Sequence, residues 1–291
     1  MTLPEIPWVR ECDRLPSLPP QIARVLEQAA LASAMDYNVV RIIQYDPAIA
    51  ARVLKLANAP LYGYSGQISS LQQAAGLLGP GVIKSIILTT PILEVWEGPG
   101  APYKQKIDYG RLWRHASATG AIAGGLGSLW NGFETDVCFT CGLLHDLGKL
   151  ALAVMEPRGF FEAFDGACHG GADPLTRERE RLGFTHWDLG RELARAWSYP
   201  DSLVAALGGT AEAPDPSEEP IHHLVVLAGY LADEWGFDDG TGWSEPRDLD
   251  ACLQAIGRSW QDLRQGEPEL KKYAALVSSE EPGRAGRRNP G

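Results

Sequence analysis

The segment Gly142-Leu-Leu-His145-Asp146-Leu-Gly-Lys149 lies inside a long apolar stretch that runs from Asp136 to Val154. Apolar residues recur in this stretch at helical spacing, so we predict one helix that carries a histidine and an aspartate next to each other. Neighbouring positions of a helix project about 100° apart, which lets an imidazole and a carboxylate share one divalent ion. The alternative is a polar pair satisfied within itself and by the backbone, as is usual for an arbitrary His-Asp dipeptide.

A third ligand is available on the preceding predicted helix, Tyr109 to Leu129, where His115 stands in Leu-Trp-Arg-His115-Ala. If the two helices face each other, His115 joins His145 and Asp146. A set of two imidazoles and one carboxylate suits Mn, Fe or Zn better than Ca. Such an ion can generate hydroxide near neutral pH and polarise a phosphoryl oxygen.

The rest of the chain has the same helical periodicity, and we find no convincing strand alternation. Helix starts are marked by Asp46-Pro47, as N-cap and first residue, and by two capping boxes, Ser70-Leu-Gln-Gln73 and Thr185-His-Trp-Asp188. Gly79-Pro80 is typical of a helix end. We therefore predict an all-α protein.

Breaks in composition divide the predicted helices into two packed lobes. Residues 1–13 form a short leader, residues 14–98 a first helical lobe, and residues 105–276 a second one. A Pro/Gly-rich stretch over 97–104 separates the lobes. Residues 277–291 have almost no apolar side chains and are predicted to be a disordered tail.

Length and composition exclude several classes of protein. The chain has 291 residues, 45% of them hydrophobic, and a formal net charge of −11, which argues for a buried core and against a general nucleic-acid binder. Its five cysteines are an odd, scattered set rather than a disulfide framework. No secretory signal is present, and the longest hydrophobic stretch, Val82 to Leu93, is too short to span a bilayer. We expect a cytoplasmic protein that does not bind membranes.

Several conspicuous residues are assigned to packing rather than to chemistry. Cys138-Phe-Thr-Cys141 lies within a helix and has no second pair, so both thiols should pack as small apolar groups. Asp46 and Asn58 should cap helices and bond a neighbouring loop. Four glycines in the predicted helix 109–129 are expected where another helix approaches closely: Gly120, Gly124, Gly125 and Gly127. Three tryptophans are expected to pack between the lobes: Trp113, Trp187 and Trp197.

At this point the chain resembles a known family. The run Leu-Leu-His-Asp-Leu-Gly-Lys is similar to the HD superfamily of metal-dependent phosphohydrolases, and roughly residues 14 to 235 resemble its HDOD branch, the HD-related output domains of bacterial signalling proteins. The ordered motifs that carry the resemblance are Leu15-Pro-Ser-Leu-Pro-Pro20, Tyr45-Asp46-Pro47, Leu56-Ala-Asn58-Ala59, Ile68-Ser-Ser70 with Leu78-Gly79, Leu112-Trp-Arg-His115, Gly142 to Lys149, Gly183-Phe-Thr-His186 with Gly190, and Trp197-Ser-Tyr-Pro200.

The resemblance implies a metal site of which part is missing. The family's single-ion site uses a His, the His-Asp pair and a distant Asp; the first three fall on His115, His145 and Asp146. The distant Asp should fall in Val226-Leu-Ala-Gly229, where this chain has Gly229.

Ligands of a second ion are missing as well. Related cyclic-dinucleotide phosphodiesterases add that ion through another His, which matches His186, and through a His-His pair, which falls on about Gly208-Gly209. His222, two turns before Gly229, and Asp233, one turn after it, are weaker substitutes. His222 and His223 are more simply interpreted as exposed or cap-region histidines.

The leading interpretation is a bacterial signal-transduction module of the HDOD type, catalytically inactive and acting through contacts with other signalling proteins or a ligand. It requires no cofactor, although a single divalent Mn, Fe or Zn ion could occupy the remaining site. The rival is a metal-dependent phosphohydrolase acting on a nucleotide or cyclic dinucleotide. Lys149 is interpreted as a solvated charge at a helix end, with phosphate contact as the alternative.

Overall fold

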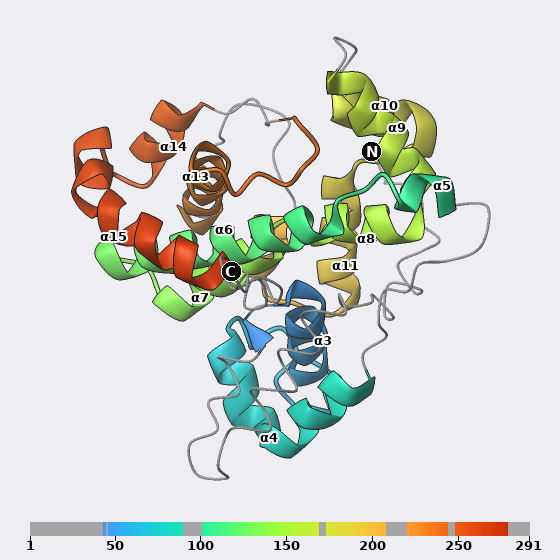
Figure 1. Cartoon of the computed structure of the whole chain (residues 1–291). Coiled ribbons are helices and arrows are strands. Elements are labelled where there is room, and N and C mark those ends of the chain that lie inside the picture. Colours follow the sequence, from blue (N-terminus) through green and yellow to red (C-terminus); the bar gives the residue numbers. More distant parts are fainter. Residues whose placement is uncertain are drawn as a thin grey trace, which may run out of the picture.

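A computed structural model describes residues 43–44, 46–89, 101–168, 173–207, 220–243 and 248–278. These residues form helices and connecting turns, and they contain no strand, so the all-α prediction is confirmed (Figure 1). The helices are α3 (Pro47–Ala57), the short 3-10 helix η2 (Pro60–Tyr62), α4 (Leu71–Thr89), α5 (Ala101–Lys104), α6 (Tyr109–Leu129), α7 (Thr135–Leu144), α8 (Leu147–Met155), α9 (Pro157–Cys168), α10 (Pro174–Leu182), α11 (His186–Ala196), α12 (Asp201–Leu207), α13 (Pro220–Glu234), α14 (Leu249–Ala255) and α15 (Trp260–Ser278).

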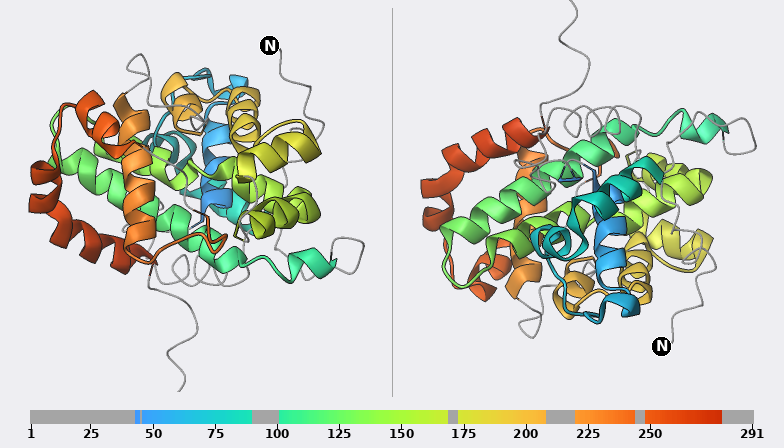
Figure 2. Two further views of the ribbon diagram at one scale, coloured as in Figure 1. Left: turned by 90° about the horizontal axis from the view of Figure 1, so that it is seen from above. Right: turned by 90° about the horizontal axis from the view of Figure 1, so that it is seen from below.

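Helix α6 is the centre of the larger group of helices. It packs along α7 and also against α13 and α15, while α8 packs against α9 and α11. In Figure 1, α6 crosses the middle of the molecule, with α13 to α15 on one side and α8 to α11 on the other. The two views of Figure 2 show the same division along α6. Residues of this helix therefore reach both halves of the larger group.

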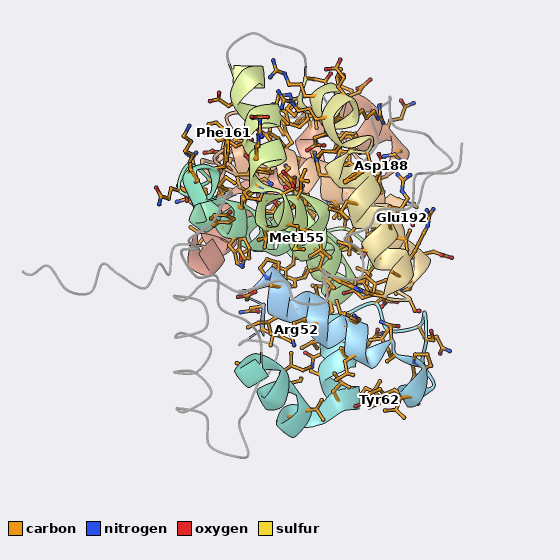
Figure 3. All side chains as sticks on the ribbon, turned by 90° about the vertical axis from the view of Figure 1, so that its right-hand side faces the viewer. Arg52, Tyr62, Met155, Phe161, Asp188 and Glu192 are labelled. Atoms are coloured by element: carbon orange, nitrogen blue, oxygen red, sulfur yellow. The ribbon has the colours of Figure 1, made fainter. Side chains whose placement is uncertain are left out.

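Helices α3 and α4 form a smaller group, which Figure 3 shows from the side with Arg52 and Tyr62 labelled. Asp46 is the N-cap of α3 and accepts from the N–H groups of Ala48 and Ile49. The buried Asn58 side chain donates to the carbonyls of Leu54 and Ile68 and accepts from the N–H of Ile68. The predicted roles of Asp46 and Asn58 in holding the fold are confirmed.

The start of α4 also agrees with the sequence. Ser70 Oγ accepts from the N–H of Gln73, and the Gln73 amide oxygen accepts from the N–H of Ser70. The helix is interrupted at Gly79, where φ is 72° and ψ is 163°, so the predicted stop at Gly79-Pro80 separates two helical segments.

Polar contacts and one cation–π contact join the two groups. The Tyr199 hydroxyl donates to the carbonyl of Ala51 at 2.7 Å, and the N–H of Leu71 donates to Thr140 Oγ1 at 3.1 Å. The ammonium of Lys55 lies 5.3 Å from the ring centroid of Trp197, within cation–π range. Trp197 thus packs at the boundary, as predicted.

Glycines allow backbones to approach at two crossings in the larger group. A Cβ atom at Gly120 of α6 would lie 3.1 Å from the backbone nitrogen of Leu143 in α7. At Gly148 of α8 it would lie 1.9 Å from the carbonyl oxygen of His186 in α11, far closer than two non-bonded atoms can approach. The glycines in 109–129 were predicted to allow the close approach of another helix, and this is confirmed at Gly120. The same reason applies to Gly148, which lies outside that helix.

The prediction of one helix over 136–154 is wrong. Helix α7 ends at Leu144 and α8 begins at Leu147, so His145 and Asp146 form the turn between them. The cause is local: the His145 ring bonds the carbonyl of Gly142 at 2.8 Å, the group that a continuous helix would pair with the N–H four residues on.

The apolar stretch that contains α7 and α8 is also relevant to whether the chain could span a membrane. The stretch Thr135–Met155, which spans both helices and was not singled out in the sequence, is long and apolar enough by composition alone to cross a bilayer. However, 83% of its apolar window is buried inside the protein. Its hydrophobicity is used in the core.

The Cys-x-x-Cys pair is also part of this core. Cys138 and Cys141 are fully buried thiols that form no disulfide, and burial raises the pKa of Cys138 to about 12. Their predicted role as packing residues is confirmed. The leader of residues 1–13 and the tail beyond Ser278 lie outside the described residues.

We expect Gly148→Ala to unfold the chain at lower denaturant concentration. The added methyl group would meet the backbone of α11, which cannot move without separating the two helices, and the cost should be about 3 kcal/mol. Gly76→Ala is the matched control, because that exposed helical glycine has no atom within 4 Å of the new Cβ and should gain up to about 1 kcal/mol. Equal stability of the two variants in urea unfolding would contradict the close approach.

Stability should also depend on pH through Asp46. Burial raises the pKa of this carboxyl from 3.8 to about 7, despite the bonds from Ile49 and Ala48. Because the folded-state pKa lies above the unfolded one, the folded chain binds the proton more tightly. Its contribution to stability is full below the unfolded pKa and is lost as the pH rises towards the folded pKa, by up to roughly 1.4 kcal/mol per pH unit.

Asp46→Asn isolates this effect, because asparagine is an equally good N-cap and does not titrate. The stability of the variant relative to the native chain should therefore rise between about pH 4 and pH 7 and level off above. Urea unfolding of both proteins across that range measures the difference. A constant difference would show that Asp46 does not carry the proton.

Candidate metal centre

Three predicted ligands meet where α6 passes the turn between α7 and α8. One ligand atom each from His115, His145 and Asp146 lies within 4.8 Å of the other two. Asp146 Oδ2 is 3.5 Å from Nε2 of His145 and 3.8 Å from Nε2 of His115. Helix α6 and the α7–α8 turn, which are separate segments of the sequence, therefore supply the cluster together.

The two imidazole rings are held in orientations that suit metal binding. Nδ1 of His145 bonds the carbonyl of Gly142 at 2.8 Å, and Nδ1 of His115 bonds the carbonyl of Phe237 at 2.9 Å. A carbonyl oxygen only accepts, so each Nδ1 carries a hydrogen, and Nε2 is the ring nitrogen left to bind a metal when it is unprotonated. Both Nε2 atoms lie near Asp146. A hydrogen bond from the other ring nitrogen to a backbone carbonyl is common in metal-bound histidines.

The charges around Asp146 keep it ionised although it is buried. Burial opposes ionisation, but the nearby His145, Lys149 and His115 outweigh it and hold the pKa of Asp146 well below its ordinary value. The side chains of Asp146 and His115 are 5% and 3% exposed. The cluster thus offers a fixed negative charge and two imidazole nitrogens in a site shielded from water.

Lys149 is not the solvated charge that the sequence suggested. Its side chain is only 4% exposed, and its ammonium lies 2.9 Å from Asp146 Oδ2 and 3.0 Å from Asp239 Oδ2. Asp239 was missed by sequence reasoning because it lies in a turn 90 residues further along the chain. The Asp238-Asp-Gly240 run signals a turn, but nothing local indicates where that turn docks.

The turn after α13 closes the site from the other side. Phe237 supplies its carbonyl to His115, Asp238 pairs with Arg111 of α6, and Asp239 pairs with Lys149. A cavity of about 230 Å³ next to Asp239 is lined by Phe160, Phe161 and Phe164 among others. The site is therefore built from three parts of the chain: α6, the α7–α8 turn, and residues 237–239.

His186 does not join the cluster. It is the first residue of α11, after the predicted capping box of Thr185 and Asp188, which is confirmed. Its ring Nδ1 and its backbone N–H both bond the buried carboxylate of Glu178, at 2.9 Å and 2.8 Å. The structure thus gives His186 a partner on α10.

The candidates on α13 are not members of the ligand cluster either. His222 and His223 are buried, so they are not exposed, but they do lie in the first turn of α13, the cap region that was the other alternative. His222 Nδ1 bonds the carbonyl of Ala205 at 3.0 Å. Asp233 does reach the site, but its carboxylate lies 3.3 Å from Nδ1 of His115, on the side of the ring opposite the ligand atom. It orients His115 and does not replace the carboxylate missing at Gly229.

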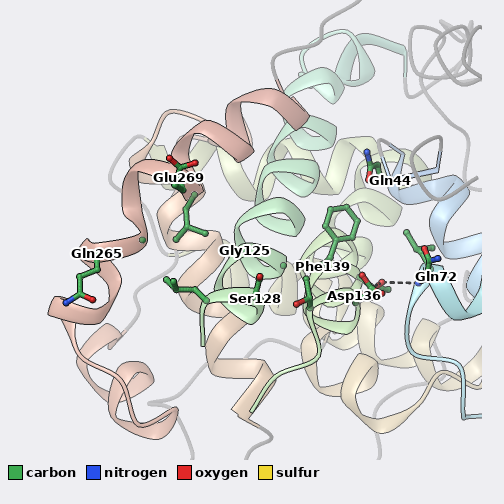
Figure 4. A pocket seen from close by; sticks show the side chains of 15 residues that line it. Gln44, Gln72, Gly125, Ser128, Asp136, Phe139, Gln265 and Glu269 are labelled. Carbon is green, nitrogen blue, oxygen red and sulfur yellow. Dashed lines mark hydrogen bonds between the residues drawn. The ribbon is translucent and has the colours of Figure 1, made fainter. Parts of the chain in front are cut away.

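A second, larger cavity of about 630 Å³ lies away from these residues (Figure 4). It is bounded by the starts of α4 and α7, the C-terminal part of α6, and α15, with Phe139 and Leu270 in its lining. Larger volume does not make it the chemical site, because the metal-ligating side chains gather elsewhere. We therefore assign the candidate chemistry to the His115, His145 and Asp146 cluster.

The donor set fits one divalent ion. Ligand atoms about 2.1 Å from a tetrahedral ion lie about 3.4 Å apart, close to the separations around Asp146. Two nitrogens and one carboxylate oxygen suit Zn, Mn or Fe. Among the described residues no second cluster of this kind occurs.

Comparisons with known proteins agree with the fold. A family model of the HDOD domain matches residues 15–211. The structure of the MmoQ response regulator of Methylococcus capsulatus is 27% identical, with a TM-score of 0.68, and covers 88% of this chain and 98% of its own. A Campylobacter jejuni virulence factor of 19% identity and TM-score 0.59, matched over 89% of this chain and 98% of its own, shows the same fold.

A curated relative from Treponema pallidum is 22% identical over 220 residues. This match covers 74% of the present chain but only 42% of that protein, so the chain spans less than half the length of this relative. The HDOD model, by contrast, covers well over half of the chain, from the first predicted motif to beyond α12. The chain belongs to the HDOD family.

Proposed function

We propose that this protein is an HDOD signalling module that acts by binding other molecules and does not hydrolyse phosphoesters. The observation that carries the proposal is the donor set: the described residues offer one cluster, with ligands for a single ion. Hydrolysis by a two-metal clamp on the attacking and leaving oxygens needs more ligands than this cluster supplies, and a single-ion site of the family's kind would need one more carboxylate. The chain has Gly229 and about Gly208-Gly209 at the positions where the resemblance would place the further metal ligands.

Similarity to a response regulator supports a signalling role. The MmoQ protein is described as such, and it is 27% identical over nearly the whole of both chains. We carry over from it only the general role in signalling. The partner we propose is another protein rather than nucleic acid, because a net charge of −11 opposes binding to phosphate backbones.

The proposed ion has a structural role. His115 on α6 and the His145-Asp146 turn would hold it, and the ion would supply positive charge to the buried Asp146 carboxylate. His115 is also bonded to Phe237, so the same contact fixes the turn after α13. Occupancy of the site would thus connect three parts of the chain that pack around α6.

His145→Asn tests this role. The asparagine amide can still donate to the carbonyl of Gly142, but the Nε2 ligand is lost. We expect the affinity for Mn, Zn or Fe to fall by more than roughly 100-fold, because the loss of even a residue that only supports a metal ligand lowers metal affinity by roughly 10–100-fold. Metal content by mass spectrometry and titration calorimetry measures the change, with phosphodiester turnover assayed in parallel.

His222→Asn is the matched control. It makes the same substitution at a buried histidine whose Nδ1 also bonds a carbonyl, but which lies outside the cluster. It should retain the metal affinity of the native chain. Hydrolysis of cyclic di-GMP or a generic phosphodiester by metal-loaded native protein, abolished in His145→Asn and retained in His222→Asn, would overturn the proposed function.

A further inference from the structure

The larger cavity, of about 630 Å³, is a second place where the chain could bind another molecule. Its walls come from the start of α4, the C-terminal part of α6, the start of α7, and α15 (Figure 4). A volume of roughly 300–1,000 Å³ is usual for pockets that bind small molecules. Because α4 belongs to the smaller group of helices and the other three belong to the larger one, a ligand here would contact both groups.

The α4 wall of this cavity is fixed in place. The N–H of Leu71, in the first turn of α4, donates to the hydroxyl of Thr140 in α7 at 3.1 Å, and both residues line the cavity. Both are also buried. The cavity is therefore already formed without a ligand, which lowers the cost of binding one.

Apolar side chains and exposed backbone form the floor of the cavity. A Cβ atom at Gly125 of α6 would lie 2.3 Å from Cδ2 of Leu270 in α15, and one at Gly266 of α15 would lie 2.3 Å from Cδ2 of Leu129 in α6. Each glycine thus accommodates a leucine from the other helix. The half-buried ring of Phe139 lines the same cavity, and Leu129 remains 47% exposed. This floor suits the apolar body of a ligand.

The charges around this floor have one sign. Asp136 of α7 and Glu269 of α15 line the cavity, both are exposed, and no basic side chain is among the described residues of its lining. In the described part of the chain neither carboxylate has an ion pair, whereas Glu267 on the same helix is paired with Lys271 at 2.7 Å. Figure 4 shows Asp136 and Glu269 on opposite sides of the cavity, with Phe139 between them. A cavity lined by one sign of charge attracts ligands of the opposite sign.

We propose that this cavity binds an organic cation, a protonated amine that carries an apolar body. The apolar body packs on the floor formed by Phe139, Leu129 and Leu270, and the ammonium is attracted by the carboxylates of Asp136 and Glu269. A neutral molecule of the same shape lacks this attraction, and an anionic one is repelled. The inference goes beyond the proposed function and does not depend on it, because the cavity and the metal centre share no residue.

Three probes that share one alkyl chain test the charge and the apolar body together: octylammonium, octanol and octanoate, each below its micelle-forming concentration. The full chain is titrated with each probe by calorimetry at low salt. Octylammonium should bind about 10-fold more tightly than octanol, since each exposed carboxylate adds a modest attraction, and octanoate should bind more weakly than octanol. Octylammonium should also raise the melting temperature of the chain, because it binds the folded state.

Variants of the two carboxylates locate the site. Asp136→Asn combined with Glu269→Gln removes both charges with little change of shape, so it should bind octylammonium no better than octanol and should bind octanol as the native chain does. Glu269→Gln alone, at an exposed position of α15, should lose part of the preference and guards against a folding failure of the double variant. Glu180→Gln is the matched control, because this exposed carboxylate on α10 lies outside the cavity, and it should keep the native preference.

The inference would be overturned if the native chain bound octylammonium no more tightly than octanol, or if the double variant kept the native preference. An equal loss of preference in Glu180→Gln would also overturn it, because the attraction would then come from the net charge of the chain. The proposed function fails on a different result, phosphodiester turnover by the native protein, which none of these titrations measures. The two failures are therefore distinguishable.

Discussion

The close contact between α6 and α7 is the constraint on which the rest of the structure depends. A Cβ atom at Gly142 would lie 2.7 Å from the carbonyl of Thr119 and 3.0 Å from Cα of Gly120, so the two backbones meet with no side chain between them. This contact brings the start of the α7–α8 turn against α6. The rings of His115 and His145 then lie 5.2 Å apart by centroid. Without the glycines, the helices would separate and the ligands would lose one another.

The central chemical consequence is that one carboxylate serves three partners. Asp146 faces the Nε2 atoms of two histidines and the ammonium of Lys149 at the same time. A buried carboxylate so surrounded is kept ionised, and it can hold a metal without a second acidic ligand nearby. The lysine in turn needs Asp239, which ties the turn after α13 to the site. Metal binding, lysine burial and docking of that turn are thus linked through shared atoms.

Local signals made much of the fold predictable. The caps at Asp46, Ser70 and Thr185 act through hydrogen bonds within a few residues, and the bounds of α6 agree with the predicted helix Tyr109 to Leu129. The break at His145 was not predictable from periodicity, because apolar residues continue across it and only a side chain bonding the backbone of Gly142 ends the helix. Asp239 was beyond reach for another reason: its pairing with Lys149 depends on how a distant turn packs against α6.

The most direct test of this account is the anomalous diffraction of crystals of the full chain soaked in Mn²⁺. The account predicts one peak, bonded by His115, His145 and Asp146, with the Lys149 ammonium still between Asp146 and Asp239. Two peaks on either side of the Asp146 carboxylate, with the lysine displaced, would contradict it.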